Sequence, residues 1–141
     1  MMSNLYKQSL ILLIPGIFLM SCVAEEGPII VETEDEEPLT VSFAADIQPI
    51  FTNNCIQCHD ETHPTGLNLQ EGSSYNLLVN VSSNNYSPNL RIEPFSTENS
   101  VLWHKINNDG VFGGGMPPNG SLSNFEKQKI EEWILQGAQD N

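Results

Sequence analysis

Two cysteines and a histidine stand together in the segment Cys55-Ile56-Gln57-Cys58-His59, and no other feature of the sequence restricts the fold as strongly. This C-x-x-C-H spacing is the pattern of covalent c-type haem attachment. Two intervening residues allow both thiols to reach the two vinyl groups of one porphyrin, and the adjacent His59 then presents its imidazole to the iron. The surrounding chain is therefore expected to fold about one covalently bound haem c.

Two other roles for this motif are disfavoured. One is a C-x-x-C disulfide beside an uninvolved histidine, and the other is half of a zinc site completed by His63 or His104. A zinc site of this kind needs further ligands at characteristic spacings, and no second C-x-x-C is present. A chance C-x-x-C-H in a domain of this length arises on the order of once in a thousand chains, so haem is the favoured interpretation.

The opposite axial position of the iron requires a second ligand, and Met116 is the leading candidate. It lies in Gly113-Gly114-Gly115-Met116-Pro117-Pro118, where glycines allow close backbone approach and prolines stiffen the loop. Methionine opposite histidine is a known haem ligation. The alternative is a methionine that only fills a gap in the core.

Two histidines compete with Met116 for the same position. His63 lies four residues after His59, so in a continued helical turn both would share a face, and His63 would approach the wrong side of the haem. His104 lies in the stretch 101–106, where a surface or supporting role is expected. Ligation by two histidines stays open as the alternative and would lower the reduction potential.

Short helices separated by long polar loops are expected over residues 43–141. The segment Asp46–Phe51 predicts a helix that leads into the motif, because its proline falls in the first turn, where a missing N–H does no harm. Further helices are predicted over Ser74–Val79 and Glu98–Asn107. The loops 81–94 and 109–120 show no strand alternation, so the expected fold class is all-α.

The final helix is the clearest one in the sequence. Ser123-Asn124-Phe125-Glu126 has the form of a capping box, and an apolar stripe with helical spacing follows it. Gly137 is expected to end the helix. The stripe consists of Phe125, Ile130, Trp133 and Ile134.

The first 21 residues resemble an export signal. A lysine precedes the apolar run Leu10–Met20, which Pro15 and Gly16 interrupt and which is short for a membrane-spanning helix. The run ends in Leu19-Met20-Ser21-Cys22, similar to the bacterial lipobox, in which a peptidase cuts before the cysteine and lipid is attached to it. Cys22 is the expected lipidation site, with an ordinary cleaved signal or an uncleaved anchor as alternatives.

Residues 22–42 form an acidic segment without aromatic residues, typical of an extended flexible tether. The whole chain has 18 acidic and 5 basic residues and a formal charge of -13, which excludes nucleic-acid binding to first order. Three parts are therefore predicted: a lipoprotein signal peptide over residues 1–21, a lipid-anchored acidic linker over residues 22–42 and a haem domain over residues 43–141.

These segments together resemble a monohaem c-type cytochrome of the class I kind carried on a bacterial lipoprotein. The matching segments are Asp46–Phe51, Cys55–His59, Gly66–Leu69, Ser100–Ile106, Met116–Pro118 and Ser123–Ala138. The resemblance implies a small all-α fold of short helices and long loops around one haem. It also implies that Cys55 and Cys58 form the thioethers, that His59 is the proximal ligand and that Met116 is the distal ligand.

Two further segments bear on this resemblance. Arg91 is the single arginine of the chain, and related domains often hold a basic residue near this position, where it would pair with a haem propionate. The alternative is a solvated loop arginine. The polar insert Asn80–Asn89 departs from the family pattern, and the sequence does not indicate its role.

The resemblance implies single-electron transfer rather than enzymatic catalysis, by a monomeric relay attached to a bacterial membrane by lipid and facing the periplasm or the cell surface. The alternative is a haem enzyme or sensor with a labile distal position, acting on peroxide or a small ligand, although a peroxide reaction would need a distal acid or base. The acidic charge predicts redox partner proteins with a basic docking surface.

Overall fold

The computed structural model describes residues 40–141, which contain one π-helical turn and four short α-helices. Within this range, strand pairing is limited to isolated bridges, so the all-α prediction is confirmed. None of the helices in residues 40–141 is long and apolar enough to cross a membrane. The predicted signal peptide, Cys22 and most of the acidic linker lie outside the described residues.

The first helical segment consists of η1 (Phe43–Ile47) followed without a break by α1 (Gln48–Asn54). The Ser42 hydroxyl accepts a hydrogen bond from the Ala45 N–H at 3.2 Å and caps the start. Pro49 lies in the first turn of α1, where its missing N–H is tolerated. The predicted helix over 46–51 is therefore confirmed, and it extends further in both directions.

Two short helices follow, α2 (Ser74–Leu78) and α3 (Val101–Asn107). The prediction for α2 is confirmed, whereas α3 begins three residues later than predicted. The Ser100 hydroxyl donates to the Ser96 carbonyl at 2.6 Å and accepts from the Glu93 N–H at 2.9 Å. Serine hydroxyls that bond to nearby backbone compete with helix formation, which accounts for the later start of α3.

The last helix, α4 (Asn124–Leu135), begins with the predicted capping box between Ser123 and Glu126. Three members of the predicted stripe are buried, namely Ile130, Trp133 and Ile134. The placement of Phe125 in that stripe is wrong, because its side chain is 59% exposed and packs under the Lys129 ammonium, 5.0 Å from the ring centroid. Gly137 follows the helix with a φ of +99°, as expected for a terminating glycine.

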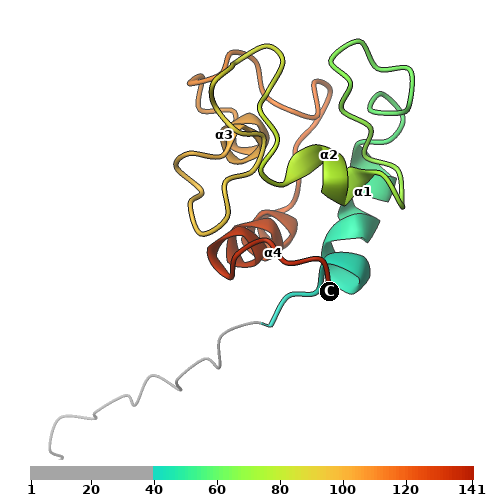
Figure 1. Ribbon diagram of the computed structural model, residues 1–141, viewed down its shortest axis with the longest axis vertical. Coiled ribbons are helices and arrows are strands. Elements are labelled where there is room, and N and C mark those ends of the chain that lie inside the picture. The colour runs from blue at the N-terminus through green and yellow to red at the C-terminus, as the bar shows by residue number, and fades with distance from the viewer. Residues whose placement is uncertain (1–39) are drawn as a thin grey trace, which may run out of the picture. The chain divides into compact units, whose positions relative to one another are not determined.

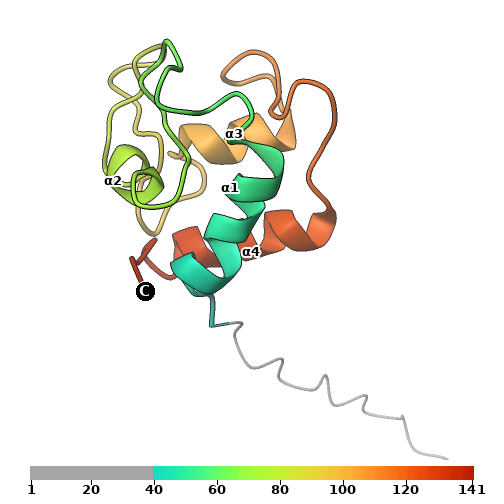
Figure 2. The same ribbon diagram turned by 90° about the vertical axis from the view of Figure 1, so that its right-hand side faces the viewer.

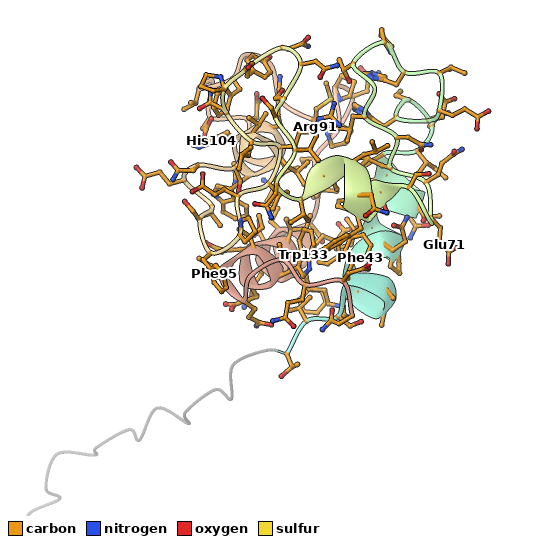
Figure 3. The ribbon with its side chains drawn as sticks, viewed as in Figure 1. Phe43, Glu71, Arg91, Phe95, His104 and Trp133 are labelled. Carbon is orange, nitrogen blue, oxygen red and sulfur yellow. The ribbon has the colours of Figure 1, made fainter. Side chains whose placement is uncertain are left out.

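An aromatic cluster joins the two ends of the folded chain. The Phe43 ring of η1 lies 5.3 Å from the Trp133 ring of α4 and 5.2 Å from the Tyr75 ring of α2. Figure 1 shows the helix formed by η1 and α1 beside α4, and Figure 2 shows it passing in front of α4. Figure 3 shows Phe43 next to Trp133. The Phe43–Tyr75 pair is edge-on and the Phe43–Trp133 pair is tilted, and such aromatic contacts add to the burial of apolar surface.

The C-terminal residue is bound to the start of this fold. The Asn141 backbone carbonyl accepts hydrogen bonds from the Ala44 N–H at 3.0 Å and from the Ser42 hydroxyl at 2.7 Å. Its side-chain oxygen accepts from the Phe43 N–H at 2.8 Å. Both ends of residues 42–141 therefore meet at one place, and Asn141 satisfies N–H groups at the first turn of η1.

An ion pair also links η1 to α4, with Lys129 Nζ 2.6 Å from Asp46 Oδ1. The Lys129 hydrogen bond and then the Ser42 N–H lower the pKa of Asp46, so the pair stabilises the fold above the ordinary Asp pKa, and its contribution is lost as pH falls through the folded-state pKa. We expect Lys129→Met to cost about 0.5–1 kcal/mol at neutral pH. The difference from wild type should shrink below pH ~4, measured by urea unfolding.

The matched control is Lys127→Met on the same helix, because no ion pair of Lys127 occurs among residues 40–141. This variant should follow the wild-type pH profile. A Lys129→Met penalty that is the same at pH 3 and pH 7 would show that the pair with Asp46 contributes nothing.

Candidate functional site

The end of α1 places the C-x-x-C-H motif in a tight turn. The His59 N–H donates to the Cys55 carbonyl at 2.9 Å, and the His59 carbonyl accepts from the Leu69 N–H at 2.9 Å. Cys55 is half-buried, Cys58 is exposed, and neither sulfur is in a disulfide. The turn therefore presents both thiols and the imidazole from one short segment, and the disulfide alternative is not found.

Two hollows that share His59, His63 and Met116 lie beside this turn, with volumes of about 180 and 460 Å³. We call the larger one the thiol-side hollow, since Cys55 and Cys58 line it, and the smaller one the insert-side hollow. Together they fall within the range of roughly 300–1,000 Å³ found for ligand sites. The residues predicted to attach the haem and to bind its iron therefore lie around two hollows that share three lining residues.

The His59 ring is held in the form that binds a metal. Burial, followed by electrostatic repulsion from His63 and more weakly from Arg91, lowers the pKa of His59, while the Leu67 backbone opposes the shift. The ring is therefore neutral at neutral pH, as ligation requires. The Leu67 backbone does not reach hydrogen-bond geometry with His59. His59 Nδ1 is the one buried side-chain polar atom within residues 40–141 that has no hydrogen-bond partner. A buried orphan atom of this kind is consistent with a ligand site.

The two other histidines are positioned differently. The His63 ring stacks on His59 with centroids 4.2 Å apart, which leaves no room for an iron between the two rings. His104 borders neither hollow. Both of its ring nitrogens are bonded elsewhere, with Nδ1 2.6 Å from Asp109 Oδ2 and Nε2 2.7 Å from the Glu98 carbonyl oxygen. These acceptors raise the pKa of His104, so it is a supporting residue of the loop after α3.

A zinc site receives no support from the described residues. No group of three or more His, Cys, Asp or Glu side chains in residues 40–141 is arranged to hold a metal ion. Burial, with the Glu126 and Cys58 charges, raises the pKa of Cys55 to about 11. The Cys55 thiol is therefore protonated at neutral pH while no metal is bound.

Met116 lies on a loop fixed to the end of α3. Its N–H donates to the Lys105 carbonyl at 2.7 Å. A Cβ on Gly115 would lie 2.5 Å from the Asn108 side chain, so only glycine fits directly before Met116. Met116 is half-buried and lies outside the apolar core cluster, which disfavours a core-filling role.

Arg91 is only 6% exposed, so the solvated-loop alternative is wrong. Its guanidinium donates to the Leu77 carbonyl at 2.6 Å and to the Thr65 carbonyl at 2.8 Å. The same side chain lines the insert-side hollow and lies next to α2 (Figure 3). A buried, permanently charged group with five N–H donors retains donors for an anion at this wall.

The sequence did not predict which residues line the insert-side hollow together with Arg91. Four consecutive residues of the insert line the insert-side hollow, and Lys105 of α3 lines it with them. The four residues are Ser83, Asn84, Asn85 and Tyr86. The available signal was the richness of the insert in side chains that form hydrogen bonds, and its position between the histidine and methionine segments.

Comparisons with known proteins place few constraints on the chain. No protein-family model matches the sequence, and no curated protein matches it. Among solved structures, the chain is similar to Kuenenia stuttgartiensis hydrazine synthase, with 26% sequence identity and a TM-score of 0.55. The match covers 71% of this chain and 16% of the hydrazine synthase chain, so this chain corresponds to a small part of that protein.

Proposed function

We propose that this chain is a monohaem c-type cytochrome that transfers single electrons. The observation that supports this most is that both motif thiols, His59 and Met116 line the same hollow, although Met116 follows far along the sequence. A thiol pair, a neutral imidazole and a thioether are the donor set that a covalent, six-coordinate haem requires. The residues present therefore fit the group.

Each residue has a distinct role in this proposal. Cys55 and Cys58 would hold the haem covalently through their sulfurs, and His59 and Met116 would bind its iron. Arg91 would offer its remaining N–H donors to a propionate. A haem bound there would supply reversible one-electron exchange.

The protein contributes rigidity and exclusion of water. Leu67, Leu78 and Leu102 line the insert-side hollow, and an apolar wall lowers the local dielectric around the ligand set. The Met116 loop is fixed at its backbone by Lys105, so little has to move when the charge of the iron changes. Electron transfer needs no proton donor, whereas peroxide chemistry would require an open position at the iron together with an acid or base. An iron bound by Met116 would offer no such open position.

The place of action is also proposed from the sequence. The lipobox-like segment before Cys22 supports export and lipid anchoring to a bacterial membrane, in the periplasm or at the cell surface. The chain would act there as a monomer. Its likeness to a small part of the hydrazine synthase chain supports a module of a kind that also occurs within a larger polypeptide.

The deciding experiment is the visible spectrum of the chain matured with a c-type haem system, oxidised and reduced. We expect haem that stays attached after denaturation, sharp low-spin bands and a weak long-wavelength sulfur-to-iron band. Absence of covalent haem would reject the proposal. Covalent haem with a high-spin spectrum and rapid cyanide binding would support the enzyme or sensor alternative instead.

The net charge of -13 leads to a prediction about the partner. Electrostatic steering toward a basic docking surface speeds encounter, and salt screens it beyond a Debye length of ~10 Å at 0.1 M. We expect the rate of electron exchange with the native partner to fall about tenfold or more between 10 mM and 300 mM salt. A rate that does not depend on salt would reject a basic partner surface.

A further inference from the structure

The insert Asn80–Asn89 contacts the two chain segments that carry the proposed axial ligands. On the histidine side, Asn84 Nδ2 donates to the Thr65 carbonyl at 2.8 Å. Thr65 in turn holds His63, with its hydroxyl 2.7 Å from His63 Nδ1, and the His63 ring stacks on His59. One end of the insert is thus fixed to the segment that follows the haem motif.

The other end of the insert is fixed to the methionine side through one lysine. Lys105 Nζ donates to the Tyr86 hydroxyl at 3.0 Å and to the Gly114 carbonyl at 3.0 Å. The carbonyl of the same Lys105 accepts the Met116 N–H at 2.7 Å. Lys105 therefore joins Tyr86 of the insert to the backbone on both sides of Gly115.

Ring contacts strengthen this second attachment. The Tyr86 ring lies 5.1 Å from the Phe112 ring, and the Lys105 ammonium lies 5.0 Å from the Tyr86 ring centroid. A Cβ on Gly113 would lie 3.5 Å from the Tyr86 hydroxyl. Tyr86 is thus packed against the loop that carries Met116 as well as bonded to it through Lys105.

We propose that the insert is a strap across the haem cleft that fixes the position of the Met116 loop, with Tyr86 and Lys105 as positioning residues and Asn84 as the anchor on the histidine side. This proposal deepens the proposed function. Its consequence for the iron rests on Met116 being the ligand proposed above. The effect of the strap on the Met116 loop does not depend on whether Met116 binds the iron. A long polar insert thereby serves to hold the distal ligand segment in place.

The test uses hydrogen exchange of the backbone amides of residues 113–116 in the full, haem-matured chain. We expect Tyr86→Phe, which removes one charge-assisted hydrogen bond and keeps the ring, to speed exchange about tenfold. Asn84→Ala should speed the same amides about threefold, although Asn84 bonds to Thr65 on the other side of the cleft. The matched control is Tyr75→Phe, because the Tyr75 hydroxyl donates to the Ala138 carbonyl, outside both hollows.

A second readout follows the consequence at the iron. Tyr86→Phe should raise the rate of cyanide binding to the oxidised haem about tenfold while Tyr75→Phe keeps the wild-type rate. The double variant Tyr86→Phe/Lys105→Met should match Lys105→Met alone, because the hydroxyl acts through the lysine.

Exchange rates that are unchanged in Tyr86→Phe, or unchanged in Asn84→Ala, would overturn the strap. A wild-type chain without the sulfur-to-iron band would instead reject Met116 as a ligand, while the exchange data would still decide whether the insert holds the loop. The two failures are therefore distinguishable.

Discussion

Replacing both motif cysteines, as Cys55→Ser and Cys58→Ser together, is expected to abolish covalent haem attachment. Serine hydroxyls do not form the thioether bonds, so haem staining of the denatured chain should fall from full signal to none. The folded state should also lose stability, because the proposed tethering would keep the haem at an effective concentration of about a millimolar. Dilution to micromolar free haem is a thousandfold loss, equal to about 4 kcal/mol, and should appear in urea unfolding followed by circular dichroism.

The third cysteine supplies the control for this experiment. Cys22→Ser removes a thiol outside the C-x-x-C-H motif and is expected to retain full haem staining while losing the lipid. Haem staining that persists in the Cys55→Ser/Cys58→Ser chain would contradict the proposed attachment.

Replacing Met116 by leucine is expected to have the second-largest effect. Leucine has nearly the volume of methionine, so unfolding should shift by less than ~1.5 kcal/mol. Without the thioether, however, the sulfur-to-iron band should vanish, the spectrum should gain high-spin character, and the reduction potential should fall by on the order of 100 mV. Redox titration with optical detection measures both changes on one sample.

Met116→His serves as the matched variant. It offers a nitrogen ligand on the same loop and should restore a low-spin spectrum at a potential below that of wild type. A wild-type spectrum and potential in Met116→Leu would contradict the role of Met116 and would direct the search for a distal ligand to other residues.

Local signals predicted the elements that depend on local physics. The capping box of α4 uses hydrogen bonds between Ser123 and Glu126, three residues apart. Contacts between residues so close along the chain can be indicated by the order of the residues alone. The helices over 46–51 and 74–79 were predicted from apolar spacing for the same reason.

The remaining features depend on contacts between distant segments. No periodicity indicates that Tyr86 meets Lys105, or that Arg91 is buried against the Thr65 carbonyl. The stripe on α4 was extended to Phe125 because spacing alone does not indicate that the first turn faces solvent. The late start of α3 depends on hydroxyl bonds of Ser100, which compete with helix propensity and are not visible in an apolar pattern.

The attachment of Asn141 to the first turn of η1 bears on how such a domain is joined to other chains. Residues 42–44 and Asn141 lie together, and Figure 3 shows Arg91, which lines the insert-side hollow, away from Phe43. A neighbouring module joined at either end would therefore leave the domain at a point away from Arg91. The hollow that Arg91 lines would stay open in a fusion or a circular permutant. A unit with this geometry can be inserted into a larger polypeptide without rebuilding that hollow.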